Sequence, residues 1–477
     1  MAEVIRRADD GARAGRSTPH PSVARSGWRD RGETGRAGRC HTSGVDQETD
    51  VVVVGAGLAG LRCALELERA GLDVVVLEAA DAVGGRIRTE EVDGFLLDRG
   101  FQLLNPAYPE LEGVVDVPAL GLQPFGAGVV ALTDGAKHLR LGHPLHAPRL
   151  LGSTLLAGGR RPGELAAMLR WARPLSTPRR HRRLADVLAA RPARTRREAL
   201  DRVGADGVLR RVVERFLAGV LLEDDGSTAD DYAQLLLWMF VRATPGLPRA
   251  GMAALPHQLA ARLTRPVHLD TAAEVVSGRR VRAAGTTYAA RAVVVATGAP
   301  DAATLLRTEV PGTRGVSTAW WSAPEPPPTH ALLHVDARTE PGGPVVNCAV
   351  VSDAAPSYAP PGAHLVQASA LLAPGRAAPE AELRRHAGEI LGTDPSGWEL
   401  LRRHDVVHAL PAQPAPFSAR RPVDLGAGHF VCGDHRDTAS IQGALVSGRR
   451  AAAAVVDSLG PTPGLSPGRA PGRRAPR

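Results

Sequence analysis

The sequence predicts an α/β protein in which a parallel sheet carries a second, inserted α+β domain, and two observations lead to this prediction. First, valine-rich runs that end in glycine recur far apart, at VVVVGAG, RAVVVATGAP and HFVCGDH. Such β-branched runs are typical of strands buried on both faces, as in a parallel sheet under helices. Second, segments such as LRRVVERFLAGVLL have apolar residues at three- and four-residue spacing, which predicts helices between residues 162 and 241.

The order of these segments predicts that each domain is assembled from separated parts of the chain. The sheet domain takes residues 49–105, 249–316 and 404–460, and the inserted domain takes the mainly helical 106–248 and then 317–403. The ends, 1–48 and 461–477, lack apolar periodicity and are rich in Arg, Gly, Ser and Pro, so disorder is expected there. For residues 1–48, a start codon assigned too early is the alternative.

Composition limits the class of protein. The 477 residues are 44% hydrophobic and 23% charged, which is typical of a globular chain. No apolar run reaches the roughly 18 residues that span a bilayer, and residues 1–48 have no apolar core of a secretory signal. The four cysteines are far apart, so neither a disulfide framework nor a metal site is predicted. We therefore expect a cytoplasmic protein.

The net charge of +8 is concentrated in one region. Residues 151–220 hold 16 arginines against 6 acidic residues. No nucleic-acid-binding module accompanies them, so nucleic acid is not expected as a partner. A solvated basic helical face is the simplest interpretation. Peripheral contact of this segment with anionic lipid or an acidic partner is the alternative.

A glycine motif between a predicted strand and a predicted helix carries the first chemical signal. Gly55, Gly57 and Gly60 have the spacing G-x-G-x-x-G. Gly55 would allow a tight turn, Gly57 would let a pyrophosphate approach the backbone, and Gly60 would let helix and strand pack closely. The helix N-terminus offers N–H groups to the phosphates. Glu78, after the second strand, can accept hydrogen bonds from a ribose diol and disfavours the extra phosphate of NADP. The motif predicts NAD or FAD.

Two further stretches favour FAD. In GGRIRT, Gly84 and Gly85 with Arg86 can reach back to the pyrophosphate through charge-assisted hydrogen bonds, although a surface turn would look similar. In CGDHRDTASIQGAL, Gly433 and Asp434 end a strand, where ligands bind in open α/β sheets. The helix that follows could stabilise negative charge on a flavin. Alone, this last segment could be an ordinary strand–helix unit.

Together these stretches resemble the FAD-dependent amine oxidase and phytoene desaturase superfamily, which includes monoamine and polyamine oxidases, protoporphyrinogen oxidase and carotenoid desaturases. The resemblance extends to GGRIRTEEVDGFLLDRGFQLL, GMAALPHQLAARL and CGDHRDTASIQGALVSGRRAA. It implies a Rossmann-like FAD-binding domain with a substrate domain over the flavin ring. The FAD is expected to be non-covalent, because no cysteine of the C-terminal motif is placed for a covalent link; Cys432 lies in the strand before Gly433.

The resemblance also implies which residues bind the cofactor. The DRGFQLL stretch would pass close to the flavin ring, and Val275 would meet the adenine through its backbone. Gly433 and Asp434 would hold the pyrophosphate and ribitol side, and Ile441 and Gln442 would face the pyrimidine end of the flavin. The predicted set is Gly55, Gly57, Leu58, Ala59, Gly60, Glu78, Ala79, Gly84, Gly85, Arg86, Gly100, Phe101, Gln102, Val275, Gly433, Asp434, Ile441, Gln442 and Ala444. No catalytic side chain is named.

Departures from the family pattern shape the expected reaction. Amine oxidases usually have an aromatic cage at the flavin face, but residues 435–442 contain no aromatic residue. Many members of the family also use a lysine held near the flavin through a water, whereas the single lysine here, Lys137, lies in a predicted hairpin. These departures favour hydride removal from an apolar small molecule, with oxygen, a quinone or another acceptor taking the electrons. An amine or polyamine oxidase and a non-catalytic FAD-binding protein are the alternatives. His435 and Arg436 would either point into the active-site cavity or lie in a surface loop.

Overall fold

The computed structural model describes residues 46–460, apart from 143–146, 151, 155–158, 160, 174–191, 328–330 and 374–375. The predicted tail 461–477 and most of 1–48 therefore lie outside the described residues, as does part of the basic segment 151–220. Asp46, Gln47 and Glu48 are an exception, because they begin strand β1 and pair with β11. The predicted N-terminal tail therefore extends three residues too far.

The first sheet has a parallel core, as the valine-rich runs predict. Its described strands run in the order β17–β18–β11–β1–β2, with β9 and β10 forming an antiparallel hairpin beside β11. Parallel pairing joins β2 to β1, β1 to β11 and β11 to β18. The bounds are β1 Asp46–Val54, β2 Val74–Leu77, β9 Ala273–Ser277, β10 Arg280–Ala283, β11 Thr286–Val295, β17 Asp424–Gly426 and β18 His429–Val431.

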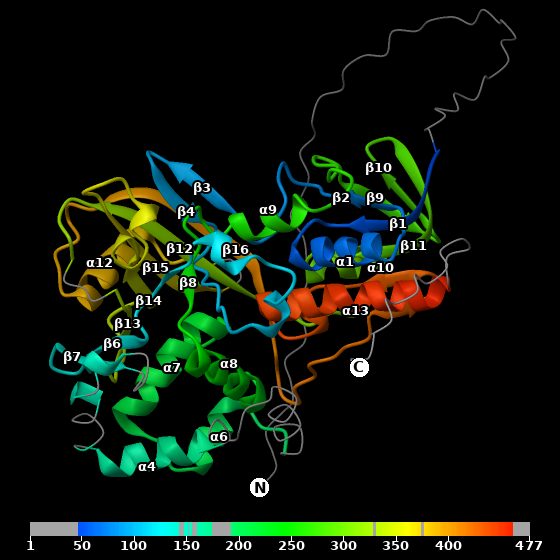
Figure 1. The fold of residues 1–477 in the computed structure, drawn as a ribbon. Coiled ribbons are helices and arrows are strands. Elements are labelled where there is room, and N and C mark those ends of the chain that lie inside the picture. The colour runs from blue at the N-terminus through cyan, green and yellow to red at the C-terminus, as the bar shows by residue number, and fades with distance from the viewer. Residues whose placement is uncertain are drawn as a thin grey trace, which may run out of the picture. The chain divides into compact units, whose positions relative to one another are not determined.

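Both faces of this sheet are covered, which explains its continuous valine runs. Val51 to Val54 are at most 4% exposed. One face packs on helices α1 (Leu58–Arg69) and α13 (Ile441–Leu459), which lie side by side (Figure 1). The other face packs on the β9–β10 hairpin and on α10 (Ala299–Leu306).

The second sheet is mostly antiparallel and belongs to the inserted part of the chain. Its described strands run in the order β16–β12–β15–β14–β13–β6–β7, with β13 and β6 parallel. Helix α12 (Glu380–Leu391) packs on one face, and α7 (Gly207–Leu221) packs on the other at β6 and β13. The bounds are β6 Gly128–Thr133, β7 Lys137–Gly142, β12 Thr313–Ala323, β13 Leu333–Asp336, β14 Val345–Val350, β15 His364–Leu372 and β16 Glu399–Pro411.

The remaining elements connect or cover the sheets. Helices α4, α6, α7 and α8 share a hydrophobic cluster of their own, where sequence periodicity predicts helices. Two short antiparallel pairs complete the described strands: the β3–β4 hairpin, and β5–β8, whose strands are distant in the sequence. The bounds are β3 Thr89–Val92, β4 Phe95–Asp98, β5 Gln123–Pro124, β8 Gly246–Leu247, α2 Val117–Leu120, α4 Pro162–Trp171, α6 Arg196–Arg202, α8 Asp230–Arg242, α9 Ala254–Ala260, α11 Val351–Ala354, and the 3-10 helices η1 Pro109–Leu111, η2 Pro148–Leu150, η4 Pro356–Tyr358 and η5 Asp434–Arg436.

The α/β prediction, a Rossmann-like parallel sheet with an inserted α+β part, is confirmed. Two predicted domain limits fall inside strands of the second sheet: the limit between 316 and 317 lies in β12, and the limit between 403 and 404 lies in β16. The limits after residues 105, 248 and 460 stay predictions. Lys137 begins β7 in the predicted hairpin and is exposed, so it is not a buried neighbour of the cofactor site. None of the described helices has the length and apolar character needed to cross a membrane.

Candidate functional site

The three glycines of the first motif have different surroundings, and these agree with their predicted roles. Gly55 has a φ of +105°, and a Cβ there would lie 2.9 Å from the carbonyl oxygen of Ala296. A Cβ on Gly60 would lie 2.0 Å from the carbonyl oxygen of Gly55, so helix and turn pack closely. A Cβ on Gly57 would meet no protein atom within 4 Å. The open space at the motif therefore lies where a pyrophosphate is expected.

The start of helix α1 is available to an anion. Gly57 is its N-cap and supplies no side-chain cap, so the backbone N–H groups of the first turn, from Leu58 and Ala59 onward, have no side-chain acceptor at the cap. Helix N-termini of this kind bind phosphate through unpaired N–H groups and the helix dipole.

Glu78 lies next to this turn, at the end of β2. Its side chain is 9% exposed, and its Oε2 accepts a hydrogen bond of 2.7 Å from the backbone N–H of Ala56. Its Oε1 accepts one of 3.0 Å from Ala80, which fixes the carboxylate beside the turn. Each carboxylate oxygen has a further lone pair that could accept from a ribose hydroxyl. The exposed Ala79 follows it at the same edge.

The second glycine pair lies against the first motif, as expected. The backbone N–H of Gly84 donates to the carbonyl oxygen of Ala56 at 2.9 Å. A Cβ on Gly85 would lie 3.5 Å from the Cα of Gly57. The loop that carries Arg86 therefore lies directly against the glycine turn.

Arg86 joins the two ends of the predicted site. Its Nη2 donates to Oδ1 of Asp434 at 2.7 Å, and its Nη1 donates to the carbonyl oxygen of Ala409 in β16 at 2.7 Å. The side-chain amide of Gln102 donates to the backbone oxygen of Arg86 at 3.1 Å. The structure thus brings together three predicted segments that are distant in the sequence.

Helix α13 begins at Ile441, after Gly433 and Asp434, where the sequence predicts a helix. Ser440 caps it, with its hydroxyl oxygen accepting from the N–H of Gly443 at 3.1 Å. Before the helix, Gly433 has a φ of +148°, and its N–H donates to the hydroxyl of Ser447 at 2.9 Å. The side-chain oxygen of Gln442 accepts a hydrogen bond of 3.0 Å from the backbone N–H of Glu110, and this bond attaches η1 to the start of α13. Contacts of Ile441, Gln442 and Ala444 with a flavin stay predictions.

Val275 lies in β9, and its contact with the adenine stays a prediction. The chain just before β9 is attached to the end of β2. His268 donates to the backbone oxygen of Val76 at 2.9 Å, and Thr271 donates to that of Glu78 at 2.8 Å. This attachment places β9 on the same side as Glu78.

The DRGFQLL stretch is anchored by a buried carboxyl group that sequence reasoning missed. Asp98 is 1% exposed and accepts hydrogen bonds from Thr89 Oγ1 (2.6 Å), the N–H of Met252 (3.0 Å) and the hydroxyl of Tyr358 (2.9 Å). Burial raises the pKa of Asp98 to about 6, against the opposing effect of these hydrogen bonds. This network fixes the chain immediately before Gly100.

The residues after Asp98 lie against the second sheet. Gly100 has a φ of +84°, and a Cβ there would lie 3.9 Å from Cγ1 of Val316 in β12. Phe101 packs edge-on against Phe125, with ring centroids 5.6 Å apart. The DRGFQLL stretch therefore contacts the same face of the second sheet as Val316.

That face carries a row of buried neutral polar side chains, which we call the polar row: Thr318, Ser369, Gln367 and Asn347. Thr318 and Ser369 lie opposite each other on β12 and β15, and their hydroxyl oxygens are 2.9 Å apart. The Ser369 hydroxyl donates to Gln367 at 3.3 Å, and the Gln367 amide donates to Asn347 of β14 at 3.2 Å. Trp320 lies on this face with a buried indole N–H that has no hydrogen-bonding partner among the described residues. No sequence pattern predicts this row, because it depends on strand register.

An aromatic pair lies close to the segment before α13. Tyr232 of α8 donates its hydroxyl to the carbonyl oxygen of Ala439 at 2.7 Å. Its ring stacks on Phe417, with centroids 5.2 Å apart. The sequence does not predict this pair, because residues 435–442 contain no aromatic residue and the two rings come from distant segments.

His435 and Arg436 are not in a surface loop. They belong to η5 and are 1% and 6% exposed. The surface-loop alternative is therefore wrong for both side chains, and their buried nitrogens lack hydrogen-bonding partners.

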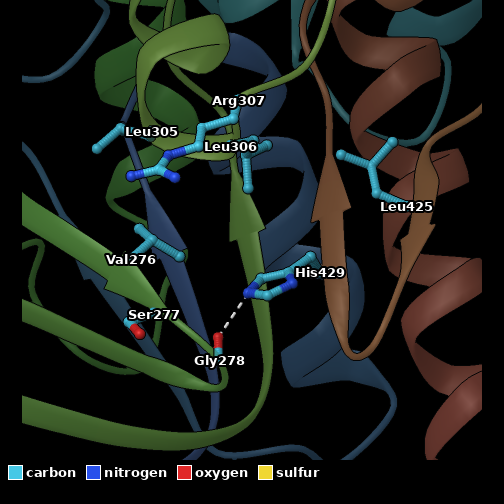
Figure 2. A pocket seen from close by; sticks show the side chains of 8 residues that line it. All are labelled: Val276, Ser277, Gly278, Leu305, Leu306, Arg307, Leu425 and His429. Atoms are coloured by element: carbon cyan, nitrogen blue, oxygen red, sulfur yellow. Dashed lines mark hydrogen bonds between the residues drawn. The ribbon is translucent and has the colours of Figure 1, made fainter.

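A hollow of about 460 Å³ lies at the other end of the first sheet (Figure 2). His429, the first residue of β18, lines it, with Nε2 2.5 Å from the carbonyl oxygen of Gly278. Gly433 follows the opposite end of β18. No residue of the predicted cofactor set lines this hollow.

The arrangement fits an FAD molecule along the carboxyl edge of the first sheet. The open space at Gly57, the uncapped start of α1 and the carboxylate of Glu78 suit its adenosine diphosphate half. Asp434 and the start of α13 lie at the far side of the same edge. Within the described ranges, no group of three or more His, Cys, Asp or Glu side chains is arranged to hold a metal ion.

The chain is similar to a known protein family over most of its length. The model of the family described as flavin containing amine oxidoreductase matches residues 58–456. A putrescine oxidase of Kocuria rosea is 46% identical over 100 residues, which are 20% of this chain and 20% of that protein. The chain is thus aligned with only a fifth of that relative's length.

Solved structures share the fold over most of the chain. A structure of putrescine oxidase bound to putrescine matches with a TM-score of 0.59 at 20% identity, covering 86% of this chain and 99% of that one. A CLA-producing fatty acid isomerase from P. acnes matches with a TM-score of 0.61 at 15% identity, covering 84% and 97%. At such identities the likeness shows the fold, and the two names differ too much for it to indicate a substrate.

The family match covers most of the described residues and includes the second glycine pair, the DRGFQLL stretch and the start of α13. The fold of solved relatives agrees with it. The chain therefore belongs to the flavin-containing amine oxidoreductase family, and its cofactor is FAD.

Proposed function

We propose that this chain is an FAD-dependent oxidoreductase that removes a hydride from an organic substrate without a positive charge. The supporting observation is the charge balance at the carboxyl edge of the first sheet. Asp434 pairs with Arg86 at 2.7 Å and Asp437 pairs with Arg450 at 3.2 Å, whereas Arg436 forms no ion pair with the described residues. A protonated polyamine would find both Asp434 and Asp437 already paired, and it would be repelled by the positive charge of Arg436.

The second sheet supports a largely apolar substrate. The polar row is neutral, and its members bond to one another. The unpartnered indole N–H of Trp320, which is fully buried, could donate to one carbonyl or hydroxyl oxygen. Such a surface suits a carbon skeleton with few polar groups better than a flexible polycation.

The reaction needs little acid–base chemistry from the chain. Bound FAD supplies a hydride acceptor. The substrate would lose one hydride and one proton and gain a double bond, and its two electrons would pass on to oxygen, a quinone or another acceptor. The chain would position the reacting carbon and exclude water. No described side chain is assigned as the catalytic acid or base.

An amine oxidase is the second candidate, and the Tyr232–Phe417 pair favours it. Stacked aromatic rings beside the last helix could flank an amine. However, Tyr232 is 1% exposed and its hydroxyl is bonded to Ala439, so the pair also serves to attach α8 to the segment before α13.

Anaerobic reduction of the bound flavin tests the substrate class. The purified protein, saturated with FAD, is mixed without oxygen with putrescine, spermidine or cyclohexylamine, and separately with neutral polyenes, cyclic ketones and fatty acids. We expect flavin absorbance to bleach with a neutral or anionic compound and to stay unchanged with every amine. Bleaching by an amine contradicts the proposal. Bleaching by dithionite alone indicates a non-catalytic FAD protein, and failure to take up FAD contradicts both.

We further propose that α4 contacts anionic membrane surfaces. Leu165 and Leu169 lie one turn apart and are 38% and 62% exposed, within the arginine-rich part of the chain. The protein should co-sediment with vesicles that contain anionic lipid, weakly or not at all with neutral vesicles, and less at high salt. Leu169→Ser should reduce this binding several-fold, while Leu400→Ser, at an exposed leucine of β16, should not. Equal binding of both variants contradicts the proposal.

A further inference from the structure

Two side chains at the carboxyl end of β18 are buried without hydrogen-bonding partners. His435 is 1% exposed and Arg436 is 6% exposed. Neither ring nitrogen of His435, and neither Nε nor Nη2 of Arg436, bonds to any described donor or acceptor. Buried polar atoms are normally hydrogen-bonded, and buried charges are normally paired. Unpartnered nitrogens on two adjacent residues therefore indicate a ligand.

The backbone around Arg436 is well fixed, so the side chain does not belong to a loose loop. Its N–H donates to the carbonyl oxygen of Gly433 at 3.0 Å. Its carbonyl oxygen accepts from the N–H of Arg421 at 3.1 Å and from Nη1 of Arg450 at 3.2 Å. The fold thus uses the main chain of Arg436 and leaves these two side-chain nitrogens unused.

No carboxylate of the described residues pairs with Arg436. The nearby carboxylates are already committed, Asp434 to Arg86 and Asp437 to Arg450. Burial, and then the positive charge of Arg421, lower the pKa of Arg436, but a guanidinium stays protonated in proteins. A trapped water could satisfy an N–H group, yet it would not neutralise the charge. An anion would do both.

We propose that Arg436, with His435 beside it, binds an anionic oxygen group of a ligand at the carboxyl edge of the first sheet. Two sources share this chemistry: the pyrophosphate of FAD and a carboxylate of the substrate. Arg436 supplies the charge and His435 one neutral N–H, because burial lowers the pKa of His435 to about 4. The proposed anion-binding role of Arg436 and His435 goes beyond the proposed reaction. It does not depend on which bond of the substrate is oxidised.

Isothermal titration with three probes separates the sources. FAD and ADP both carry a pyrophosphate, and benzoate, titrated into FAD-saturated protein, represents a substrate carboxylate. Arg436→Met should weaken FAD and ADP binding at least about thirtyfold if the pyrophosphate is the partner. If the carboxylate is the partner, only benzoate binding should be lost. Arg436→Lys, which keeps the charge, should retain part of the affinity in either case.

Controls exclude loss of folding. Removing an unpaired buried charge should raise the urea midpoint of the FAD-free Arg436→Met variant, so weaker binding would not come from unfolding. Arg449→Met is the matched control, because the Arg449 side chain of α13 is 48% exposed and pairs with Glu110 of η1. The proposal is overturned if Arg436→Met binds all three probes as the wild type does, or loses no more affinity than Arg449→Met. A wild-type protein that binds no FAD would instead overturn the proposed function.

Discussion

At the scale of single residues, the second and third glycines of the FAD turn, Gly57 and Gly60, should respond differently to the same substitution. In Gly57→Ala the new methyl group meets no protein atom within 4 Å. The fold should lose less than about 1 kcal/mol, from the poorer N-cap, but FAD should bind at least about tenfold more weakly, because the methyl occupies the approach of the pyrophosphate. In Gly60→Ala the methyl would lie 2.0 Å from a backbone oxygen, and stability should fall by about 2 kcal/mol or more.

Urea unfolding and flavin fluorescence titration measure the two effects separately. Each variant is the control for the other, since both add one methyl group to the same turn. If Gly57→Ala bound FAD as tightly as the wild type, the turn could not be the pyrophosphate site.

At the scale of elements, the close approach of α1 and α13 depends on Gly448. A Cβ there would lie 2.3 Å from the carbonyl oxygen of Ala59. Exchanging glycine for alanine inside a helix usually gains up to about 1 kcal/mol. Gly448→Ala should instead lower the free energy of unfolding by about 1–3 kcal/mol, because the two helices must separate. FAD affinity should fall as well, since α1 carries the first-turn N–H groups.

Gly163→Ala in α4 is the matched control for this prediction. A Cβ on Gly163 meets nothing within 4 Å, so this exchange should be neutral or slightly stabilising. Urea unfolding of both variants gives the comparison. Changes of the same sign in both would mean that the approach of α1 to α13 does not limit stability.

At the scale of the whole molecule, local motifs were predictable and long-range partnerships were not. The roles of Gly55 and Gly60 follow from a strand, a turn and a helix that are adjacent in the sequence, and the structure agrees with them. The partners of Asp98 lie 9, 154 and 260 residues away, at Thr89, Met252 and Tyr358. No local pattern distinguishes such a carboxylate from an exposed one, because its burial depends on how both sheets assemble.

The contacts within the candidate site were unpredictable for the same reason, because they join segments that are distant in the sequence. Arg86 and Asp434 were each predicted to bind the cofactor, but their ion pair joins residues 348 positions apart. The polar row exists only because the register of β12, β15 and β14 places Thr318, Ser369 and Asn347 opposite one another. A shift of one residue would turn each of these side chains to the opposite face.

The stability of the whole molecule should depend on pH through His435. Burial lowers its folded-state pKa from 6.5 to about 4, with Asp434 opposing and Arg436, Arg86 and Arg421 adding to the effect. The unfolded chain therefore binds a proton between these two values that the folded chain excludes. The contribution of His435 to the free energy of unfolding is complete above pH 6.5. It decreases as the pH falls and is lost below pH 4, a change of about 3 kcal/mol.

Buried carboxyl groups act in the opposite direction, so the wild-type profile alone does not isolate His435. Burial raises the pKa of Asp98 and of Asp437 to about 6, and their contributions are lost as the pH rises through that value. Urea unfolding of the FAD-free protein between pH 7 and pH 4 should show the wild type losing up to about 3 kcal/mol relative to His435→Gln, which cannot titrate there. His257→Gln, at an exposed histidine of α9, should follow the wild type at every pH. Parallel curves for the wild type and His435→Gln would show that the ring is accessible to protons in the folded state, and would contradict its burial at the carboxyl edge of the sheet.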